Sequence, residues 1–180
     1  AHTGNSIVYS ESYINYIGAL NPDNYLVSPQ KYMIAEGSMI SFYACAQDEN
    51  YPYEHFSVEV STAGNTSADD FTTVSEWTIS AKGSRQGDRT MRQSSWIKYE
   101  ADLSEYAGQE IYVALRHFNC TDQFYLNVDD IEIFAASETD SSKEGNWMHY
   151  DDGSYADGVG GPASFYWGIK LRPEELGQYS

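Results

Sequence analysis

The sequence predicts an all-β domain built as a two-sheet antiparallel sandwich. Aromatic residues make up 15% of the 180-residue chain, and Tyr occurs 16 times, more often than Lys and Arg together, which total 10. β-Branched and aromatic residues recur in short runs that end in turn residues, a pattern typical of strands. Helical periodicity is not sustained over three turns anywhere in the sequence. Strands spaced by turns at this rhythm favour a sandwich.

The predicted strands follow one another at short intervals. Eight runs qualify: Ser6 to Tyr9, Tyr25 to Val27, Met39 to Ala46, His55 to Ser61, Thr73 to Ser80, Trp96 to Glu100, Glu110 to Phe118, and Phe124 to Phe134. In the fourth run Phe56, Val58 and Val60 alternate with polar residues, which indicates one buried and one solvated face. Residues 67–71 and Leu103 to Ala107 are each predicted to form a single helical turn.

The chain divides into one domain and a tail. Residues 1–135 form the predicted sandwich, residues 136–146 are a small, polar linker, and residues 147–180 follow as a short tail. The tail offers one strong strand, Phe165 to Leu171, after a glycine-dense stretch that we interpret as a turn. About 34 residues cannot bury a core alone, so we expect this extra C-terminal strand to pack against the domain or against a partner. Neither an initiator Met nor a signal sequence opens the chain, so we expect a segment of a longer precursor.

Charge and cysteine content exclude several classes of function. The chain carries 27 acidic and 10 basic residues, a net charge of -17, which disfavours nucleic acid and anionic membrane surfaces as partners. No apolar run approaches the ~18 residues of a membrane helix, so we expect no membrane insertion. Cys45 and Cys120 are too few for a disulfide scaffold, and free thiols are favoured over a bridge, which would need their strand ends to coincide.

An aspartate pair is the strongest candidate for a metal site. Asp129 and Asp130 interrupt an apolar run, and neighbouring residues of a strand face opposite ways, so one carboxylate is driven inward. A buried carboxylate is costly unless it is paired or metal-bound, and hard cations such as calcium take oxygen ligands. The alternative is a hydrogen-bonded structural Asp at a strand bulge, with Asp130 facing solvent.

Two further groups of residues could bind ligands. Arg85, Arg89 and Arg92 belong to a locally basic stretch that could dock an anionic partner, such as a sulfated glycan or an acidic protein, although a solvated loop is commoner. The rings of Tyr51, Tyr53 and Trp96 lie in or beside predicted loops or solvated faces and could stack on sugars, although most such rings simply pack.

Catalysis is not predicted. The sequence holds no nucleophile elbow, phosphate-cradling loop or dinucleotide fingerprint, and no two of its four histidines stand at metal-ligand spacing. We interpret His117 as a hydrogen-bonded loop histidine.

Three blocks of sequence resemble a known family. They are LNPDNYLVSP from Leu20, FYACAQDENYPYEHFSVEVSTAGN from Phe42, and VALRHFNCTDQFYLNVDDIEI from Val113. Together they resemble the cleaved-adhesin family, the adhesin and hemagglutinin modules attached to gingipain-type proteases. The resemblance implies a jelly-roll sandwich, bound calcium, and adhesion to a host surface or matrix protein, to haemoglobin or to a glycan, on the outer cell surface or outside the cell. The tail, residues 147–180, resembles the start of a following β module in such surface proteins.

The resemblance also implies a ligand set for calcium. By position the ligands fall on Asn24, Asp129 and Asp130, with backbone oxygens of His2 and Gly4 in the opening turn. The family's domain begins with a strand and an Asp-rich loop that this sequence lacks, so an opening strand is expected to be missing. A sandwich without it has an unpaired edge, which the segment from Phe165 to Leu171 could fill in the same chain or, by strand exchange, in a neighbour.

We consider three functions, of which the resemblance favours the first. The first is a secreted or cell-surface adhesin module, stabilised by calcium, that binds host proteins or glycoproteins. The second is a carbohydrate-binding module of a polysaccharide-degrading system. The third is a structural spacer that presents a neighbouring module.

Overall fold

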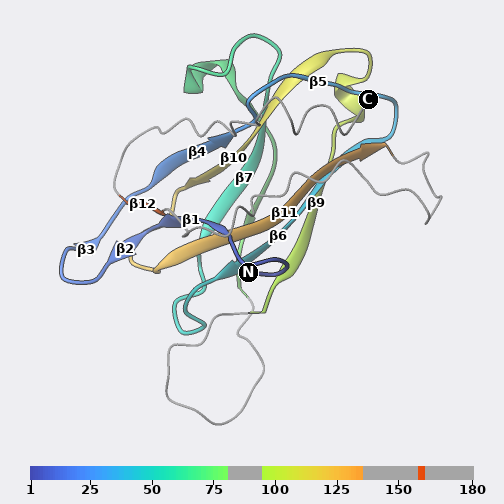
Figure 1. Cartoon of the computed structure of the whole chain (residues 1–180). Helices are drawn as coiled ribbons and strands as arrows, with labels where there is room; N and C mark the ends of the chain where they lie inside the picture. Colours follow the sequence, from blue (N-terminus) through green and yellow to red (C-terminus); the bar gives the residue numbers. More distant parts are fainter. Residues whose placement is uncertain (81–94, 136–157, 161–180) are drawn as a thin grey trace.

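A computed structural model describes residues 1–80, 95–135 and 158–160, and in this part of the chain two β-sheets face one another (Figure 1). The first sheet has the strand order β12-β1-β11-β6-β9 and the second β4-β10-β7-β8, with β5 also paired to β10. The strands of the first sheet are β1 (Val8–Glu11), β6 (Ser38–Ala46), β9 (Ile97–Asp102), β11 (Tyr125–Ala135) and β12 (Gly158–Gly160). Those of the second are β4 (Asp23–Val27), β5 (Tyr32–Met33), β7 (His55–Ser61), β8 (Thr72–Thr78) and β10 (Glu110–Phe118). A separate hairpin joins β2 (Tyr13–Ile14) to β3 (Gly18–Ala19).

The strand order is that of a jelly roll. Apart from the short β2, β3, β5 and β12, the strands in chain order are β1, β4, β6, β7, β8, β9, β10 and β11. The first, eighth, third and sixth of these form one sheet, and the second, seventh, fourth and fifth form the other. Two interleaved Greek keys produce this arrangement. The predicted antiparallel jelly-roll sandwich is therefore confirmed.

The predicted strands also match in detail. β7 and β10 have the predicted bounds, and the other six begin and end within two residues of them. The two predicted helical turns are present as the 3₁₀ turns η1 (Ala68–Asp70) and η2 (Ser104–Tyr106). None of the helical segments described here is long and apolar enough to cross a membrane.

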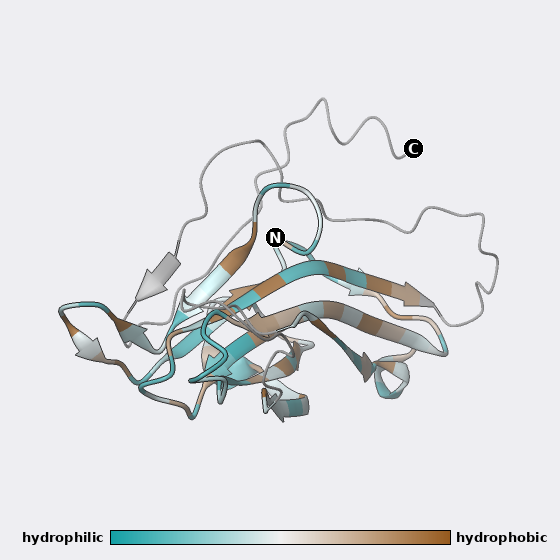
Figure 2. Ribbon diagram, turned by 90° about the horizontal axis from the view of Figure 1, so that it is seen from below, coloured by the Kyte–Doolittle hydropathy of each residue, from teal (hydrophilic) through white to brown (hydrophobic). Residues whose placement is uncertain are grey.

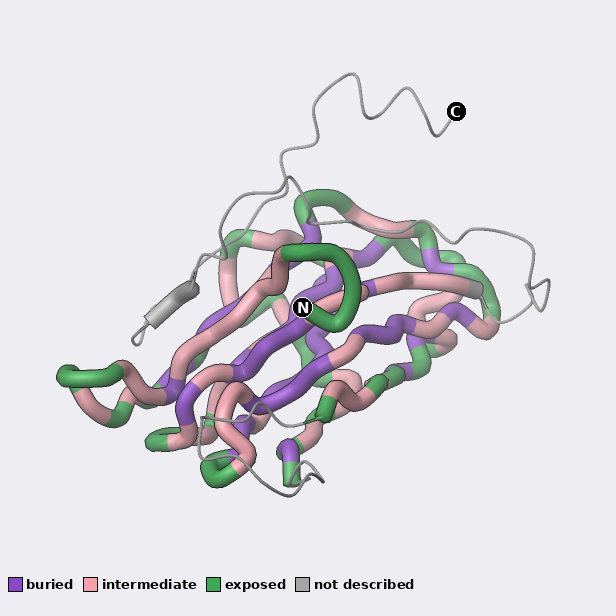
Figure 3. The backbone as a smooth tube through the Cα atoms, turned by 60° about the horizontal axis from the view of Figure 1, so that its bottom comes forward, coloured by how far each residue is buried: buried purple, intermediate pink, exposed green. Residues whose placement is uncertain are grey.

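The core lies between the sheets and is aromatic toward β8 and β9. Phe42 and Tyr99 of the first sheet meet Phe56 and Trp77 of the second, with ring centroids 5.0 to 6.0 Å apart. Hydrophobic and hydrophilic residues alternate along the strands (Figure 2), and buried residues follow the middle strands of the sandwich (Figure 3). Edge-to-face and offset rings add about 0.5–1.5 kcal/mol per pair to the free energy of burial.

One predicted solvated face is instead buried. On β7 the polar residues Ser57, Glu59 and Ser61 are as buried as their apolar neighbours. β7 is a central strand, and Glu59 accepts hydrogen bonds from the hydroxyls of Ser57 and Thr73. The alternation correctly separates apolar from polar positions, but it does not reveal how neighbouring strands cover the polar ones.

The edge of the first sheet differs from the sequence-based expectation. Gly158–Gly160, which we interpreted as part of a turn, pairs in parallel with β1. The predicted strand from Phe165 to Leu171 lies outside the described residues. The eight strands of the jelly roll all lie between Val8 and Ala135. β12 lies on the β1 edge, which we expected to be unpaired or filled by the segment from Phe165 to Leu171. The missing opening strand stays a prediction.

Candidate functional site

Three connections meet at one end of the sandwich, which we call the loop end. They are the β2–β3 hairpin, the loop of residues 47–54 between β6 and β7, and the loop of residues 119–124 between β10 and β11 (Figure 1). The Phe124 carbonyl accepts a hydrogen bond from Ser12 N at 2.8 Å, and the Gln123 side chain accepts one from Tyr53 N at 3.0 Å. These bonds hold the three connections together as one ordered surface.

Large apolar side chains are exposed on the loop end. Tyr16 at the hairpin tip is fully exposed, Ile17 is 73% exposed, and Tyr51 and Tyr53 are each 54% exposed. We call these four residues the loop-end patch. Tyr16 has φ of 69°, a left-handed conformation that is unfavourable for a bulky residue.

A groove of about 270 Å³ opens beside the patch. Rings and polar side chains line it together: Tyr13, Asn15, Asp48, Tyr51, Asp122, Gln123 and Phe124. Aromatic faces beside carboxylates and amides can stack on the apolar face of a ring and bond its hydroxyls.

The predicted binding residues differ in how accessible they are in the structure. Tyr51 and Tyr53 are exposed, as a binding role requires. Trp96 is not an open platform, because it is half-buried and its ring packs in a T-shaped contact with the His2 ring, at 5.9 Å between centroids. Arg85, Arg89 and Arg92 lie outside the described residues.

The predicted metal residues come together in part. Asp129 accepts hydrogen bonds from the backbone N–H groups of His2 and Thr3, at 2.7 and 3.2 Å. Asp130 Oδ2 lies 2.6 Å from His2 Nδ1, and Asp130 Oδ1 accepts the hydroxyl of Thr3. The His2 ring stacks on Tyr43 of β6 with centroids 3.7 Å apart. The opening turn, which continues into Gly4 at φ 59°, is thereby fastened across β11 and β6.

A β-bulge explains why both carboxylates face the same loop. Alternation predicts opposite directions for Asp129 and Asp130, but the register of β11 with β6 shifts between Asp129 and Glu132. Asp130 has φ of 50°, which turns its side chain back toward the loop. The alternative interpretation, a hydrogen-bonded Asp at a strand bulge, is thus correct about the bulge and the hydrogen bonds. It is wrong about solvent, because the Asp130 side chain is only 7% exposed.

Asn24 lies elsewhere. It is buried in β4 of the second sheet, where its side-chain N–H group donates to Ser10 Oγ at 2.9 Å. The side-chain oxygens that meet at the opening turn include those of Asp129, Asp130 and Thr3. Calcium takes six to eight oxygens, so these residues fit a hard cation in chemistry, and backbone carbonyls and water would have to complete its shell.

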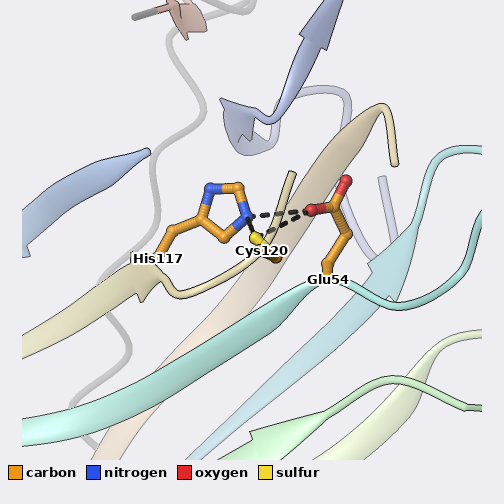
Figure 4. Close-up of side chains that lie close together, drawn as sticks. All are labelled: Glu54, His117 and Cys120. Atoms are coloured by element: carbon orange, nitrogen blue, oxygen red, sulfur yellow. Dashed lines mark hydrogen bonds and ion pairs between the residues drawn. The ribbon is translucent and has the colours of Figure 1, made fainter. Parts of the chain in front are cut away.

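A buried polar cluster beneath the loop end was not predicted. Glu54, His117 and Cys120 converge there from the residue before β7, the end of β10 and the following loop (Figure 4). His117 is a buried strand residue, 3% exposed, and not the loop histidine we expected. Cys120 and Cys45 are both free, as expected. Burial first, and then the charge of Glu54, raises the pKa of the Cys120 thiol to about 12.

Comparison with known proteins identifies the fold's family. The family model described as the Cleaved Adhesin Domain matches residues 1–133. The chain belongs to the cleaved adhesin domain family. The sequence resemblance is thus confirmed, and the matching region is the whole jelly roll but for its last residues.

Relatives of this cleaved adhesin domain occur in Porphyromonas gingivalis. It is 42% identical over 137 residues to gingipain R1 and to Lys-gingipain, a match that covers 74% of this chain and 8% of either relative. It is 40% identical over 138 residues to hemagglutinin A, which covers 74% of this chain and 6% of the relative. The chain thus spans less than a tenth of these proteins, and what it shares with the proteases is an adhesin domain.

Solved structures of cleaved adhesin domains resemble the structure of this chain. The crystal structure of the K3 cleaved adhesin domain of Lys-gingipain from P. gingivalis has a TM-score of 0.61 at 41% identity and covers 72% of this chain and 73% of that chain. The K2 domain gives a TM-score of 0.59 at 36% identity, with 74% of each chain covered.

Proposed function

We propose that this cleaved adhesin domain is an extracellular or surface-exposed attachment module that binds host proteins or glycoproteins through its loop end. The observation that carries the proposal is the loop-end patch: four large apolar side chains held exposed on connections that are hydrogen-bonded to one another. Membership of an adhesin family, with a relative named hemagglutinin A, supports the same role. The module acts by binding alone and performs no reaction.

The patch has the composition of a protein-binding surface. Tyr rings supply large contact areas with few rotatable bonds, so they lose little entropy when they are ordered, and they are enriched among the residues that dominate binding energy. Tyr16 and Ile17 protrude at a hairpin tip and can enter a hollow on a partner. Because the chain carries a net charge of -17, the partner surface is expected to be neutral or basic. Red-cell surface proteins, haemoglobin and matrix proteins are the partner classes to test.

The groove beside the patch favours a second candidate, carbohydrate binding. Tyr51 offers a ring, and Asp48, Asp122 and Gln123 offer acceptors around a volume of about 270 Å³. That space accommodates about one or two sugar rings. In this alternative the glycan of a glycoprotein, and not its polypeptide, is bound.

Calcium stabilisation of the opening turn is part of the proposal. Asp129, Asp130 and the Thr3 hydroxyl would hold the ion, which would supply positive charge between two neighbouring carboxylates. The ion would fasten the opening turn to β11. Its role would be structural, because these residues lie against β6 and β11 rather than in the loop-end patch.

The binding experiment compares the wild-type chain with a variant carrying Tyr16→Ala, Tyr51→Ala and Tyr53→Ala. Fluorescently labelled protein is added to red cells and to immobilised haemoglobin, and bound label is measured. Cell binding is the correct readout, since agglutination additionally requires several modules on one molecule. Met33→Ala is the matched control, because Met33 is 65% exposed but lies beside the opposite end of β10.

The proposal predicts at least a tenfold loss of binding for the triple variant and none for the control. Loss of wild-type binding after enzymatic removal of glycans from the cells would support the carbohydrate alternative. A wild-type chain that binds neither target, or a triple variant that binds as well as wild type, would refute the loop end as the attachment surface and favour a spacer.

A further inference from the structure

The cluster of Glu54, His117 and Cys120 brings three metal-binding atoms face to face. His117 Nε2 lies 2.9 Å from Glu54 Oε2 and 3.1 Å from Cys120 Sγ, and the sulfur lies 3.4 Å from the same carboxylate oxygen. Figure 4 shows the three side chains pointing toward one another from different segments. A carboxylate, an imidazole and a thiol form a ligand set suited to borderline metals such as zinc.

The separations suit one small ion. Zinc binds sulfur at about 2.3 Å and nitrogen or oxygen at about 2.0–2.2 Å, and tetrahedral angles then place the donor atoms about 3.4–3.6 Å apart. The three observed separations of 2.9, 3.1 and 3.4 Å need to widen by only a few tenths of an ångström. Rotation of the side chains within their rotamer wells is enough for such a change.

The remaining polar atoms of the cluster are already oriented by other partners. His117 Nδ1 lies 2.7 Å from Ser10 Oγ, so the second ring nitrogen has a hydroxyl partner. Glu54 Oε1 accepts from Ser12 Oγ at 2.9 Å and from Phe124 N at 3.0 Å. These contacts leave Nε2, Oε2 and Sγ turned inward, which is the supporting arrangement that metal-binding histidines and carboxylates usually have.

Charge and burial favour a cation at this position. Glu54 is fully buried and His117 is 3% exposed. A buried carboxylate needs compensating charge or several donors. A divalent ion bound to the carboxylate, a neutral imidazole and a thiolate gives a neutral assembly.

We propose that Glu54, His117 and Cys120 form a site for a zinc-class transition-metal ion beneath the loop end. On binding, Cys120 releases its thiol proton to solvent and binds the ion as a thiolate. His117 coordinates through the lone pair of Nε2, with the ring proton on Nδ1 facing Ser10. Water fills the fourth position. The ion joins Glu54, just before β7, to the end of β10 and the following loop. It thereby rigidifies the loops that carry the loop-end patch. This site is separate from the aspartate pair in position and in ligand chemistry.

The test uses cobalt(II) as a spectroscopic probe of the full chain without an affinity tag, after treatment with a chelator. A cobalt–thiolate bond gives a near-ultraviolet charge-transfer band, and tetrahedral coordination gives intense visible bands. We expect both with one cobalt per chain, and we expect zinc, but not a large excess of calcium, to remove them. Cys120→Ser should abolish the charge-transfer band, whereas Cys45→Ala, the control for the other thiol, should retain it.

A second variant tests the carboxylate as a ligand. Glu54→Gln keeps the shape of the side chain and should weaken zinc binding, measured by calorimetry, at least tenfold. Circular dichroism of each variant reports whether it folds. Absence of a charge-transfer band in the folded wild-type protein at millimolar cobalt would overturn the proposal, and so would a band that survives Cys120→Ser. Either result would leave the cluster as a hydrogen-bonded support, without bearing on adhesion through the loop end.

Discussion

Replacing Glu54 by Gln tests how much the buried cluster contributes to stability without any metal. In the wild-type protein Glu54 Oε2 faces His117 Nε2 at 2.9 Å and Cys120 Sγ at 3.4 Å, while Oε1 accepts from Ser12 and Phe124. Gln keeps one oxygen that can accept from Ser12 and Phe124. It turns an N–H₂ group, however, toward His117 and Cys120. A hydrogen bond to a charged group contributes about 1.5–3 kcal/mol, and a mismatched buried donor adds to the loss. We expect the free energy of unfolding to fall by about 2–4 kcal/mol.

Urea denaturation followed by tryptophan fluorescence, with chelator present throughout, measures this loss. Domains of this size have unfolding free energies of about 5–15 kcal/mol, so the expected change is large and easily resolved. Glu110→Gln is the control, because Glu110 is exposed at the start of β10 and should change stability by less than about 0.5 kcal/mol. If Glu54→Gln were as stable as its control, the carboxylate charge would have no part in holding the loop end.

Three further predictions concern other parts of the molecule. Calcium should raise the melting temperature of the wild-type chain, and Asp129→Ala should abolish that rise; a wild-type protein with no shift would end the calcium proposal. Tyr16→Gly should be about 0.5–1 kcal/mol more stable than Tyr16→Ala, because only glycine adopts φ of 69° without steric cost, and urea melts giving the opposite order would exclude strain at the hairpin tip. Because the pKa of Cys120 rises from 9.0 to about 12 on folding, the folded state holds this proton more tightly than the unfolded chain. The protonated Cys120 thiol therefore leaves the free energy of unfolding unchanged below pH 9. Between pH 9 and pH 12 the free energy of unfolding falls by about 1.4 kcal/mol per pH unit. Cys120→Ser should flatten this alkaline decline, and equal slopes in the two proteins would contradict the shift.

The fold was largely predictable from local pattern. Runs such as His55–Ser61 and Glu110–Phe118 alternate cleanly because one face of each strand packs in the core, and the structure has both with the predicted bounds. The two-residue strands of the hairpin and β5 are too short to show any period. β12 falls in a glycine-dense stretch, which indicates a turn. Its pairing with β1 depends on position in the fold, which no local pattern encodes.

The sites were less predictable, because they depend on which segments meet. The aspartate pair interrupts an apolar run, and a strand bulge was one of its two interpretations. The sequence did not show that the bulge turns both carboxylates toward one loop. Asn24 came from family resemblance and lies in the other sheet. Glu54 and His117 are 63 positions apart and were not linked, although Glu54 before a strand and His117 beside Cys120 are residue types that bind metals. Only the pairing of β7 with β10 brings them together.

Amide hydrogen exchange of the domain, free and bound to soluble haemoglobin, tests most directly whether the loop end is the surface that attaches. The account predicts slower exchange on binding at residues 13–19, 47–54 and 119–124, with little change around β5 and η2 at the opposite end. Protection confined to β5 and η2, with the loop end exchanging as in the free domain, would contradict it.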